Sequence, residues 1–199
     1  MKGYYNMDLT SPRTIRNIQE QFGFTFKKGL GQNFLTARNI LEEIVDAAEI
    51  ESGVIEVGPG FGVLTSELAQ NSDKVVTIEI DERLIDVLDY TLAEYDNVKI
   101  INEDILKLDL KKVIDDEFNG EKVSIAANLP YYITTPIITK LLEEKLPIKN
   151  IVVMVQKEVA ERMSAKPSTK DYGAITVLCQ YYTEPSIVAN VPALSLIHI

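Results

Sequence analysis

The stretch AANLPYYITTP ends an apolar run with four residues whose types could bind a flat amine, Asn128, Leu129, Pro130 and Tyr131. Because proline fixes φ and lacks a backbone N–H, we expect the carbonyls before it to point out of the sheet. An outward carbonyl and the Asn128 side-chain oxygen are both acceptors, so together they could bind the two hydrogens of an exocyclic amine. Tyr131 offers a face on which a base could stack. The alternative is a proline-containing turn with half-buried tyrosines.

A glycine-rich turn follows the first expected strand. Gly58, Gly60 and Gly62 would let the backbone turn tightly and approach a ligand closely. The second expected strand ends in Glu79, 19 residues beyond Gly60, where a carboxylate could accept hydrogen bonds from both hydroxyls of a ribose. A dinucleotide site needs the wider spacing GxGxxG to seat a pyrophosphate. The closer spacing favours S-adenosylmethionine, which has no phosphate, although such turns also occur as plain strand–helix connections.

A third expected strand adds an acidic end, because it finishes in Asn102, Glu103 and Asp104. In a nucleoside site, a carboxylate at Asp104 could accept a hydrogen bond from the exocyclic amine of adenine. The alternative is that Asp104 caps the turn that follows. Three acidic or glycine-rich strand ends in succession favour a cofactor site.

The elements that must position these residues alternate along the chain as short β-branched runs and amphipathic segments. Continuous apolar strands separated by helices indicate a parallel sheet covered on both faces. We therefore predict an open, doubly wound α/β fold that binds ligands at the carboxyl ends of its strands. The expected strands are 54–58, 74–80, 98–102, 122–127, 150–155 and 186–191, and the expected helices are 37–49, 63–71, 82–95, 110–117, 134–144, 156–164 and 172–183.

The composition of the 199-residue chain limits the kinds of catalytic and metal sites that it could form. Cys179 is the only cysteine and His198 the only histidine, so an internal disulfide, a metal site and a histidine-dependent triad are not expected. No apolar run is long enough to span a bilayer, and the N-terminus lacks the apolar centre of a signal peptide, so we expect a cytoplasmic protein that uses no membrane.

Charge is unevenly distributed. The net charge is −10, yet residues 1–40 hold six basic and two acidic side chains, a net of +4. The remaining 159 residues therefore carry −14. A basic arm on an acidic body could contact phosphate locally, although a solvated helix with scattered charge would look the same.

In combination, these motifs resemble the ribosomal RNA adenine-N6 dimethyltransferases, and most closely the bacterial small-subunit (16S) type. The resemblance implies a Rossmann-like class I S-adenosylmethionine-dependent methyltransferase. It divides the chain into a basic N-terminal arm with the GQNFL motif (1–36), a methyltransferase domain (37–192) and an atypical tail (193–199). The segments that carry it are FKKGLGQNFL (26–35), VIEVGPGFGVLT (54–65), TIEID (77–81), NEDIL (102–106), ANLPYYITTPII (127–138), MVQKEVAERM (154–163) and STKDYG (168–173).

The resemblance also implies roles for particular residues. The reaction would add two methyl groups to each of two neighbouring adenines near the 3′ end of 16S rRNA in the immature 30S subunit, with a monomer as the expected enzyme. Catalysis would fall to Asn128, Leu129, Pro130 and Tyr131. Contacts to S-adenosylmethionine are implied at Asn33, Leu35, Gly58, Gly60, Glu79, Asp104 and Asn128. The RNA contacts expected are Lys27, Lys28 and Arg38 around GQNFL, with Gln156, Lys157, Glu158 and Arg162 as further candidates.

The family pattern is lost after Pro192, where the family continues into a last strand and a small helical domain. We therefore expect a shortened product in which the strand at 150–155 has an exposed edge. The alternatives are a 23S rRNA adenine methylase of the macrolide-resistance type and a ribosome assembly factor without turnover. A DNA adenine methylase would more usually carry D-P-P-Y, and a nicotinamide dehydrogenase would need the wider glycine spacing.

Overall fold

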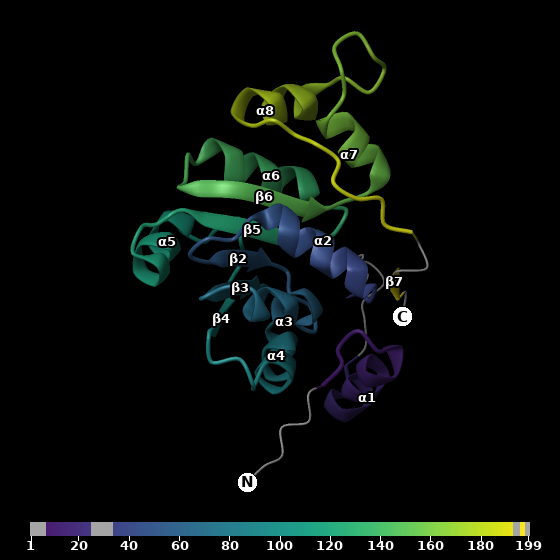
Figure 1. Cartoon of the computed structure of the whole chain (residues 1–199), viewed down its shortest axis with the longest axis vertical. Helices are drawn as coiled ribbons and strands as arrows, with labels where there is room; N and C mark the ends of the chain where they lie inside the picture. Colours follow the sequence, from purple (N-terminus) through teal and green to yellow (C-terminus); the bar gives the residue numbers. More distant parts are fainter. Residues whose placement is uncertain (1–6, 25–33, 193–195, 198–199) are drawn as a thin grey trace.

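A five-stranded parallel sheet forms the middle of the molecule (Figure 1). The computed structural model describes residues 7–24, 34–192 and 196–197. The strands lie in the order β4-β3-β2-β5-β6, so the strand order reverses between β2 and β5. In such a sheet the crevice for a ligand opens at the carboxyl ends of these strands. The strand bounds are β2 Val54–Val57, β3 Val75–Glu79, β4 Val98–Asn102, β5 Val123–Asn128 and β6 Ile148–Met154.

The pairing register brings the candidate strand ends to one edge of the sheet. Val57 at the end of β2 pairs with Ile78 of β3 on one side and with Ala127 of β5 on the other. Glu79 pairs with Asn102 across β3 and β4. The residues that follow these strands therefore meet at the same edge, as expected for parallel strands.

Two apolar clusters cover the two faces of the sheet, because alternate residues of each strand point to opposite sides. Val54 and Val75 join the cluster beneath α1 to α4, whereas Ile55 and Val76 join the cluster beneath α5, α6 and α8. The helix bounds are α1 Pro12–Phe22, α2 Arg38–Ala48, α3 Val63–Gln70, α4 Ile85–Thr91, α5 Leu110–Phe118, α6 Thr134–Glu143, α7 Lys157–Met163 and α8 Ala174–Tyr182, with a 3-10 turn η2 at Glu82–Leu84.

The predicted fold class is confirmed, and five of the six predicted strands form. The prediction of a strand at 186–191 is wrong, because this segment has no strand partner and Ile187 and Val188 stay exposed. The predicted helix 82–95 divides into η2 and the shorter α4. Within the described residues, no helix has the length and apolar character that crossing a membrane requires.

Two described features go beyond the predicted elements, and the first shows a packed helix where the alternative was a solvated one. Helix α1 buries Ile15 and Ile18 in the same cluster as α2 and α3, so this part of the N-terminal arm packs on the domain. A short antiparallel pair joins β1, Phe34–Leu35, to β7, Leu196–Ile197. The division into arm, domain and tail stays a prediction.

Strand β6 lies at the outer edge of the described sheet, beside β5. Its seven residues are all half-buried, whereas the four residues of β2 are buried. Among the described residues no further strand pairs with β6, so it is the edge strand expected at 150–155, with half-buried side chains.

Candidate active site

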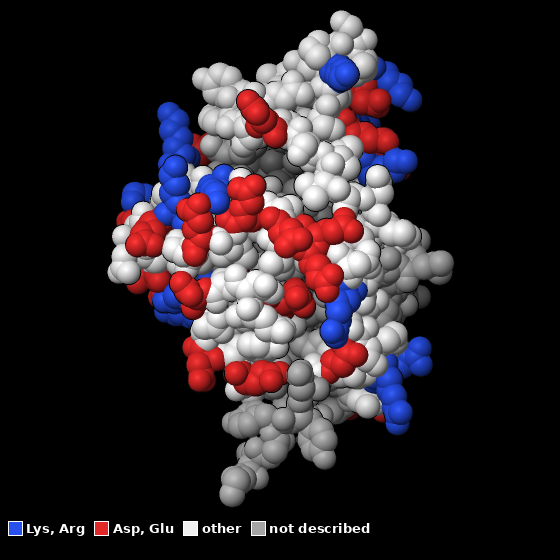
Figure 2. All heavy atoms as spheres, viewed as in Figure 1, with Lys and Arg blue, Asp and Glu red and all other residues white. Residues whose placement is uncertain are grey.

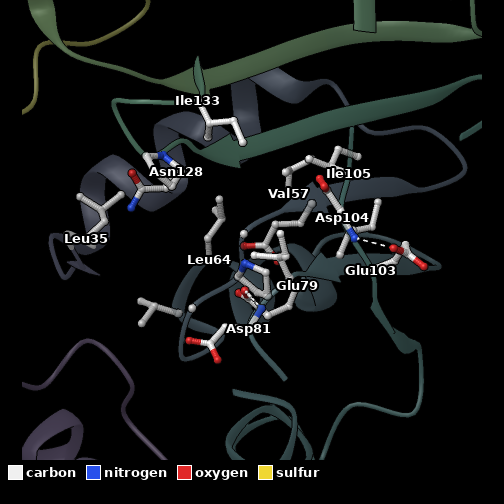
Figure 3. A pocket seen from close by; sticks show the side chains of 18 of the residues that line it. Leu35, Val57, Leu64, Glu79, Asp81, Glu103, Asp104, Ile105, Asn128 and Ile133 are labelled. Atoms are coloured by element: carbon white, nitrogen blue, oxygen red, sulfur yellow. Dashed lines mark hydrogen bonds between the residues drawn. The ribbon is translucent and has the colours of Figure 1, made fainter. Parts of the chain in front are cut away.

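A cavity lies where the carboxyl ends of β2, β3, β4 and β5 meet (Figure 3). Leu35, Val63, Leu64 and Ile105 contribute apolar walls. Figure 3 shows Asn128 on one side of the hollow and Asp104 on the other, with Glu79 between them. The cavity therefore joins residues that are far apart in the sequence, including most of the candidate site.

The glycine turn forms the rim of this cavity between β2 and α3. Gly58, Gly60 and Gly62 all adopt positive φ angles of 73°, 60° and 83°, which favour glycine over other residues. Gly62 also lies so close to α4 that an added Cβ would meet Leu92 Cδ2 at 3.0 Å. The turn thus needs its glycines, and Gly58 and Gly60 line the cavity as predicted.

Glu79 is held in place at the end of β3. Its side chain is 6% exposed, and its Oε1 accepts a hydrogen bond of 2.8 Å from the backbone N–H of Asp81. The backbone N–H of Gly60 also donates to this carboxylate, which links β3 to the glycine turn. Burial raises the pKa of Glu79, and these hydrogen bonds oppose that effect. A carboxylate fixed in this way can accept hydrogen bonds from the hydroxyls of a sugar.

Asp104 both caps a turn and lines the cavity, whereas its contact to an adenine amine stays a prediction. Its Oδ1 accepts a hydrogen bond of 3.0 Å from the backbone N–H of Leu106, so it caps the turn after β4. It also lines the cavity beside Glu103, whose Oε1 accepts a hydrogen bond of 3.0 Å from the Asp104 backbone N–H. The capping bond holds Oδ1, and Oδ2 lies 3.7 Å from Lys107 Nζ, so both oxygens of the Asp104 carboxylate have partners in the turn while the residue lines the cavity.

The Asn128–Tyr131 turn closes the cavity at the end of β5. The Leu129 side chain is 2% exposed and anchors the turn in the core, while Asn128 and Pro130 line the cavity. The Pro130 carbonyl already accepts hydrogen bonds from the Ile133 N–H at 3.2 Å and the Thr134 hydroxyl at 3.1 Å. Since a carbonyl oxygen has two lone pairs, Pro130 is occupied as an acceptor.

The two tyrosines of this turn differ in their position. Tyr132 lines the cavity, whereas Tyr131 does not, although 44% of Tyr131 is exposed. The residue predicted to contact the substrate base was Tyr131. A turn with two adjacent tyrosines gave no signal to say which of them would reach the cavity.

Glu56, two residues before Gly58, also lines the cavity, although it is not among the predicted site residues. It is 1% exposed, and its Oε2 accepts a hydrogen bond of 2.5 Å from the hydroxyl of Thr65 in α3. Burial raises the pKa of Glu56 to about 7, and the hydrogen bond from Thr65 works in the opposite direction. A carboxylate in the middle of a buried strand was the available signal, since such a group is rare without a specific purpose.

The predicted RNA contacts are only partly described. Lys27 and Lys28, like the predicted cofactor contact Asn33, lie outside the described residues. Arg38 begins α2, away from the cavity lining, and its guanidinium lies 3.7 Å from the carboxylate of Asp8. Figure 2 shows acidic side chains across the middle of one face of the molecule and basic ones mainly toward its margins.

The charge of the cavity distinguishes between the cofactors considered. Five carboxylates and no lysine or arginine stand among its described lining residues, namely Glu56, Glu79, Asp81, Glu103 and Asp104. This acidic lining disfavours the negative charge of a pyrophosphate, although Arg83 pairs with Asp81 and Lys107 lies 3.7 Å from Asp104. No group of three or more His, Cys, Asp or Glu side chains in the described ranges could hold a metal ion.

The sheet order, the glycine turn and the acidic strand ends together define a Rossmann-like class I S-adenosylmethionine-dependent methyltransferase fold. The crystal structure of a dimethyladenosine transferase from Plasmodium falciparum superimposes with a TM-score of 0.63 and 34% identity, over 74% of this chain and 52% of that one. That of the 23S rRNA methyltransferase ErmE gives a TM-score of 0.59 and 31% identity, over 66% and 51% of the two chains.

The model of the ribosomal RNA adenine dimethylase family matches residues 23–196, so the chain belongs to this family. It is 55% identical over 188 residues to the Ribosomal RNA small subunit methyltransferase A of Bacillus mycoides (strain KBAB4). The protein of the same name from Bacillus thuringiensis (strain Al Hakam) gives the same identity. The alignments cover 93% of this chain and 64% of the relatives' own length.

Proposed function

We propose that the chain uses S-adenosylmethionine to dimethylate N6 of two adjacent adenosines near the 3′ end of 16S rRNA during maturation of the small ribosomal subunit. The observation that carries this proposal is the cavity in which Glu79, Asp104 and Asn128 face one space lined by carboxylates and no described basic residue. Family membership and the 55% identity to small-subunit methyltransferases support the choice of substrate.

The cofactor contacts follow from the position of each strand end. Glu79 would bind the ribose hydroxyls, Asp104 the adenine amine of the cofactor, and Gly58 and Gly60 would let the backbone approach the methionine part. Leu35 contributes an apolar wall. Asn33 belongs to the same proposal through its place in GQNFL. When bound, S-adenosylmethionine supplies the methyl group.

Asn128 and the adjacent carbonyls would activate the substrate amine. Adenine N6 is a weak nucleophile because its lone pair is delocalised into the ring. Acceptance of its two hydrogens by Asn128 Oδ1 and a backbone carbonyl would favour a more pyramidal nitrogen. Leu129 is the better carbonyl candidate, since the Pro130 oxygen already accepts two hydrogen bonds. Pro130 would then shape the turn rather than bind the amine.

The transfer itself needs positioning more than proton chemistry. The bound cofactor would supply each methyl group from its sulfonium, and N6 would release one proton for each methyl group gained. Asn128 would hold N6 in line and Tyr131 would stack on the extruded base. The sequence contains a single histidine, His198, and no histidine base is required.

Lys27, Lys28 and Arg38 would contact rRNA phosphates around the base that is being modified. One chain carries every residue assigned to the site, so we propose a monomer as the working unit. Its partner would be the immature 30S subunit in the cytoplasm.

Transfer of labelled methyl groups to undermethylated 30S subunits tests the proposal. The expected result is N6,N6-dimethyladenosine at two adjacent positions of 16S rRNA, recovered after digestion to nucleosides. Label that enters only 23S rRNA would favour the macrolide-resistance type of enzyme. Tight binding of 30S subunits without any transfer would favour an assembly factor and overturn the catalytic assignment.

A further inference from the structure

Phe24 lies where helix α1 meets the carboxyl edge of the sheet, although it does not line the cavity itself. The side chain is buried, with 7% exposed. Its ring centroid lies 5.5 Å from that of Phe61 at an interplanar angle of 75°, an edge-to-face contact. The guanidinium carbon of Arg83 lies 4.9 Å from the same ring centroid, within cation–π range. One aromatic ring therefore contacts two loops that flank the cavity.

The contact with Arg83 leads from Phe24 to Glu79 through a series of hydrogen bonds. Arg83 Nε donates to Asp81 Oδ1 at 2.8 Å, and Arg83 Nη2 donates to Asp81 Oδ2 at 2.5 Å. Such a two-point pairing fixes the orientation of both planar groups. The Asp81 backbone N–H in turn donates to Glu79 Oε1 at 2.8 Å. Displacement of Arg83 would therefore shift Asp81 and, through its backbone N–H, the carboxylate of Glu79.

The contact with Phe61 leads from Phe24 to the glycine turn. Phe61 is fully buried and stands between Gly60 and Gly62, both of which have positive φ. The glycines of this turn have no side chains that could pack in the core, so the buried Phe61 ring anchors the turn there. The Gly60 backbone N–H donates to the Glu79 carboxylate. Both contacts of Phe24 therefore converge on the same carboxylate.

We infer that Phe24 is a positioning residue of the cofactor site, which holds the glycine turn and the Asp81–Arg83 pair together so that Glu79 is preset to bind a nucleoside. The inference builds on the proposed binding of S-adenosylmethionine. It makes the N-terminal helix part of the binding machinery, because Phe24 follows α1 directly. By thermodynamic reciprocity, a ligand that needs this arrangement stabilises the docking of α1.

Phe22 supplies a matched control in the same turn of chain. Gly23 adopts a left-handed conformation with φ of 59° and ψ of 28°, and the chain reverses direction there. Phe22 consequently packs on Tyr90 of α4, with ring centroids 5.5 Å apart, while Phe24 packs on Phe61. Both aromatic residues anchor α1, but only the second is connected to Glu79.

Calorimetric titration with S-adenosylmethionine compares Phe24→Leu, Phe24→Tyr and Phe22→Leu with the wild type. We expect Phe24→Leu to weaken binding roughly five- to tenfold through loss of the ring's contacts with Arg83 and Phe61. Phe24→Tyr keeps the ring, and Phe22→Leu leaves the connection to Glu79 intact, so both should bind within about twofold of wild type. The fold loss of affinity in the double variant Phe24→Leu/Arg83→Gln should be smaller than the product of the fold losses in Phe24→Leu and Arg83→Gln, because both residues act on Glu79 through the same contacts.

A measurement on the wild type avoids any dependence on the folding of a variant. Saturation with S-adenosylmethionine should slow amide hydrogen exchange in the last turn of α1 more than in α5, which packs in the other apolar cluster.

Wild-type affinity in Phe24→Leu, or equal weakening in Phe22→Leu, would overturn the inference, as would unchanged exchange in α1. Failure of the wild type to bind S-adenosylmethionine would instead remove the proposed function. Binding and methyl transfer by the wild type, together with an unaffected Phe24→Leu, would leave that function standing and refute the role of Phe24 alone.

Discussion

Thr65 of α3 donates a 2.5 Å hydrogen bond to the buried carboxyl of Glu56 in the central strand β2. The bond joins the helix that follows the glycine turn to the strand that precedes it. It therefore fixes the two ends of that turn across nine residues of sequence. The carboxyl has little access to water, and Glu79 on the neighbouring strand further raises its pKa.

The pKa of about 7 predicts that Glu56 makes stability depend on pH. In the unfolded chain this carboxyl titrates near 4.5, so between these values the folded state binds more protons and stability falls as pH rises. The cost above pH 7 is on the order of 3 kcal/mol, from about 1.4 kcal/mol for each unit of pKa shift. Glu56→Gln keeps an acceptor for Thr65 and removes the ionisation.

Urea unfolding at a series of pH values from 5 to 8 checks this prediction. The stability of Glu56→Gln relative to the wild type should increase with pH across the series. Glu79 is present in both proteins, but it interacts with a charged Glu56 only in the wild type, so the difference includes this repulsion. In Thr65→Val the pKa of Glu56 should rise further, because the hydrogen bond that lowers it is lost. A constant difference between Glu56→Gln and wild type would contradict the assignment.

Asp104→Asn separates the two roles of this residue. The amide can still accept the hydrogen bond from the Leu106 N–H, so the cap should survive, but the charge that favours the adenine amine is lost. We expect affinity for S-adenosylmethionine to fall roughly tenfold, as for a charge-assisted hydrogen bond, with little change in thermal stability.

Asp109 is the matched control for capping. It accepts a hydrogen bond of 3.0 Å from the Lys112 N–H at the start of α5 and does not line the cavity. Asp109→Ala should cost about 1 kcal/mol of stability and leave cofactor binding intact. Unchanged binding by Asp104→Asn would show that Asp104 serves only the turn.

Asn128→Ala should reduce methyl transfer far more than it reduces affinity for the cofactor. The side chain lies at the cavity margin opposite Asp104, so part of the cofactor affinity should remain (Figure 3). Methyl transfer should fall by at least about a hundredfold, as when a single aligned polar group is removed from other active sites. Single-turnover transfer to undermethylated 30S subunits measures the loss. Retained transfer would remove Asn128 from the catalytic assignment.

Substitution of Tyr131 and substitution of Tyr132 should affect different steps, use of the RNA substrate and binding of the cofactor. Tyr131→Ala should weaken use of the RNA substrate by about 1–3 kcal/mol, the contribution of a stacked base, and leave cofactor binding unchanged. Tyr132→Ala should alter cofactor binding, because only Tyr132 lines the cavity. Titration with S-adenosylmethionine, together with the KM for 30S subunits, distinguishes the two. The opposite pattern would exchange their roles.

Residue types and spacing were sufficient to predict the five central strands and the edge at which they end. Parallel strands of β-branched residues leave few alternatives. Glu79 and Asn128 end such strands, and Asp104 comes two residues after another. The predicted strand at 186–191 has a similar composition but no neighbour to pair with. Strand composition cannot reveal the absence of a partner, because pairing is decided by the rest of the fold.

Other features depended on contacts that spacing does not encode. A helix in the N-terminal arm was considered only as a solvated one, and the packing of Ile15 and Ile18 of α1 against the core was not predicted. The Thr65–Glu56 bond and the contact of Phe24 with Arg83 join segments whose proximity comes only from the folded sheet. The choice of Tyr132 over Tyr131 for the cavity likewise depends on the geometry of one turn.

Calorimetric titration of the wild-type chain with S-adenosylmethionine, and separately with NAD, tests the central claim most directly. The acidic cavity and its closely spaced glycines predict one S-adenosylmethionine bound per chain, with binding abolished or strongly weakened in Glu79→Ala, and no detectable binding of NAD. Absence of S-adenosylmethionine binding by the folded wild type, or equal binding of NAD, would contradict the account.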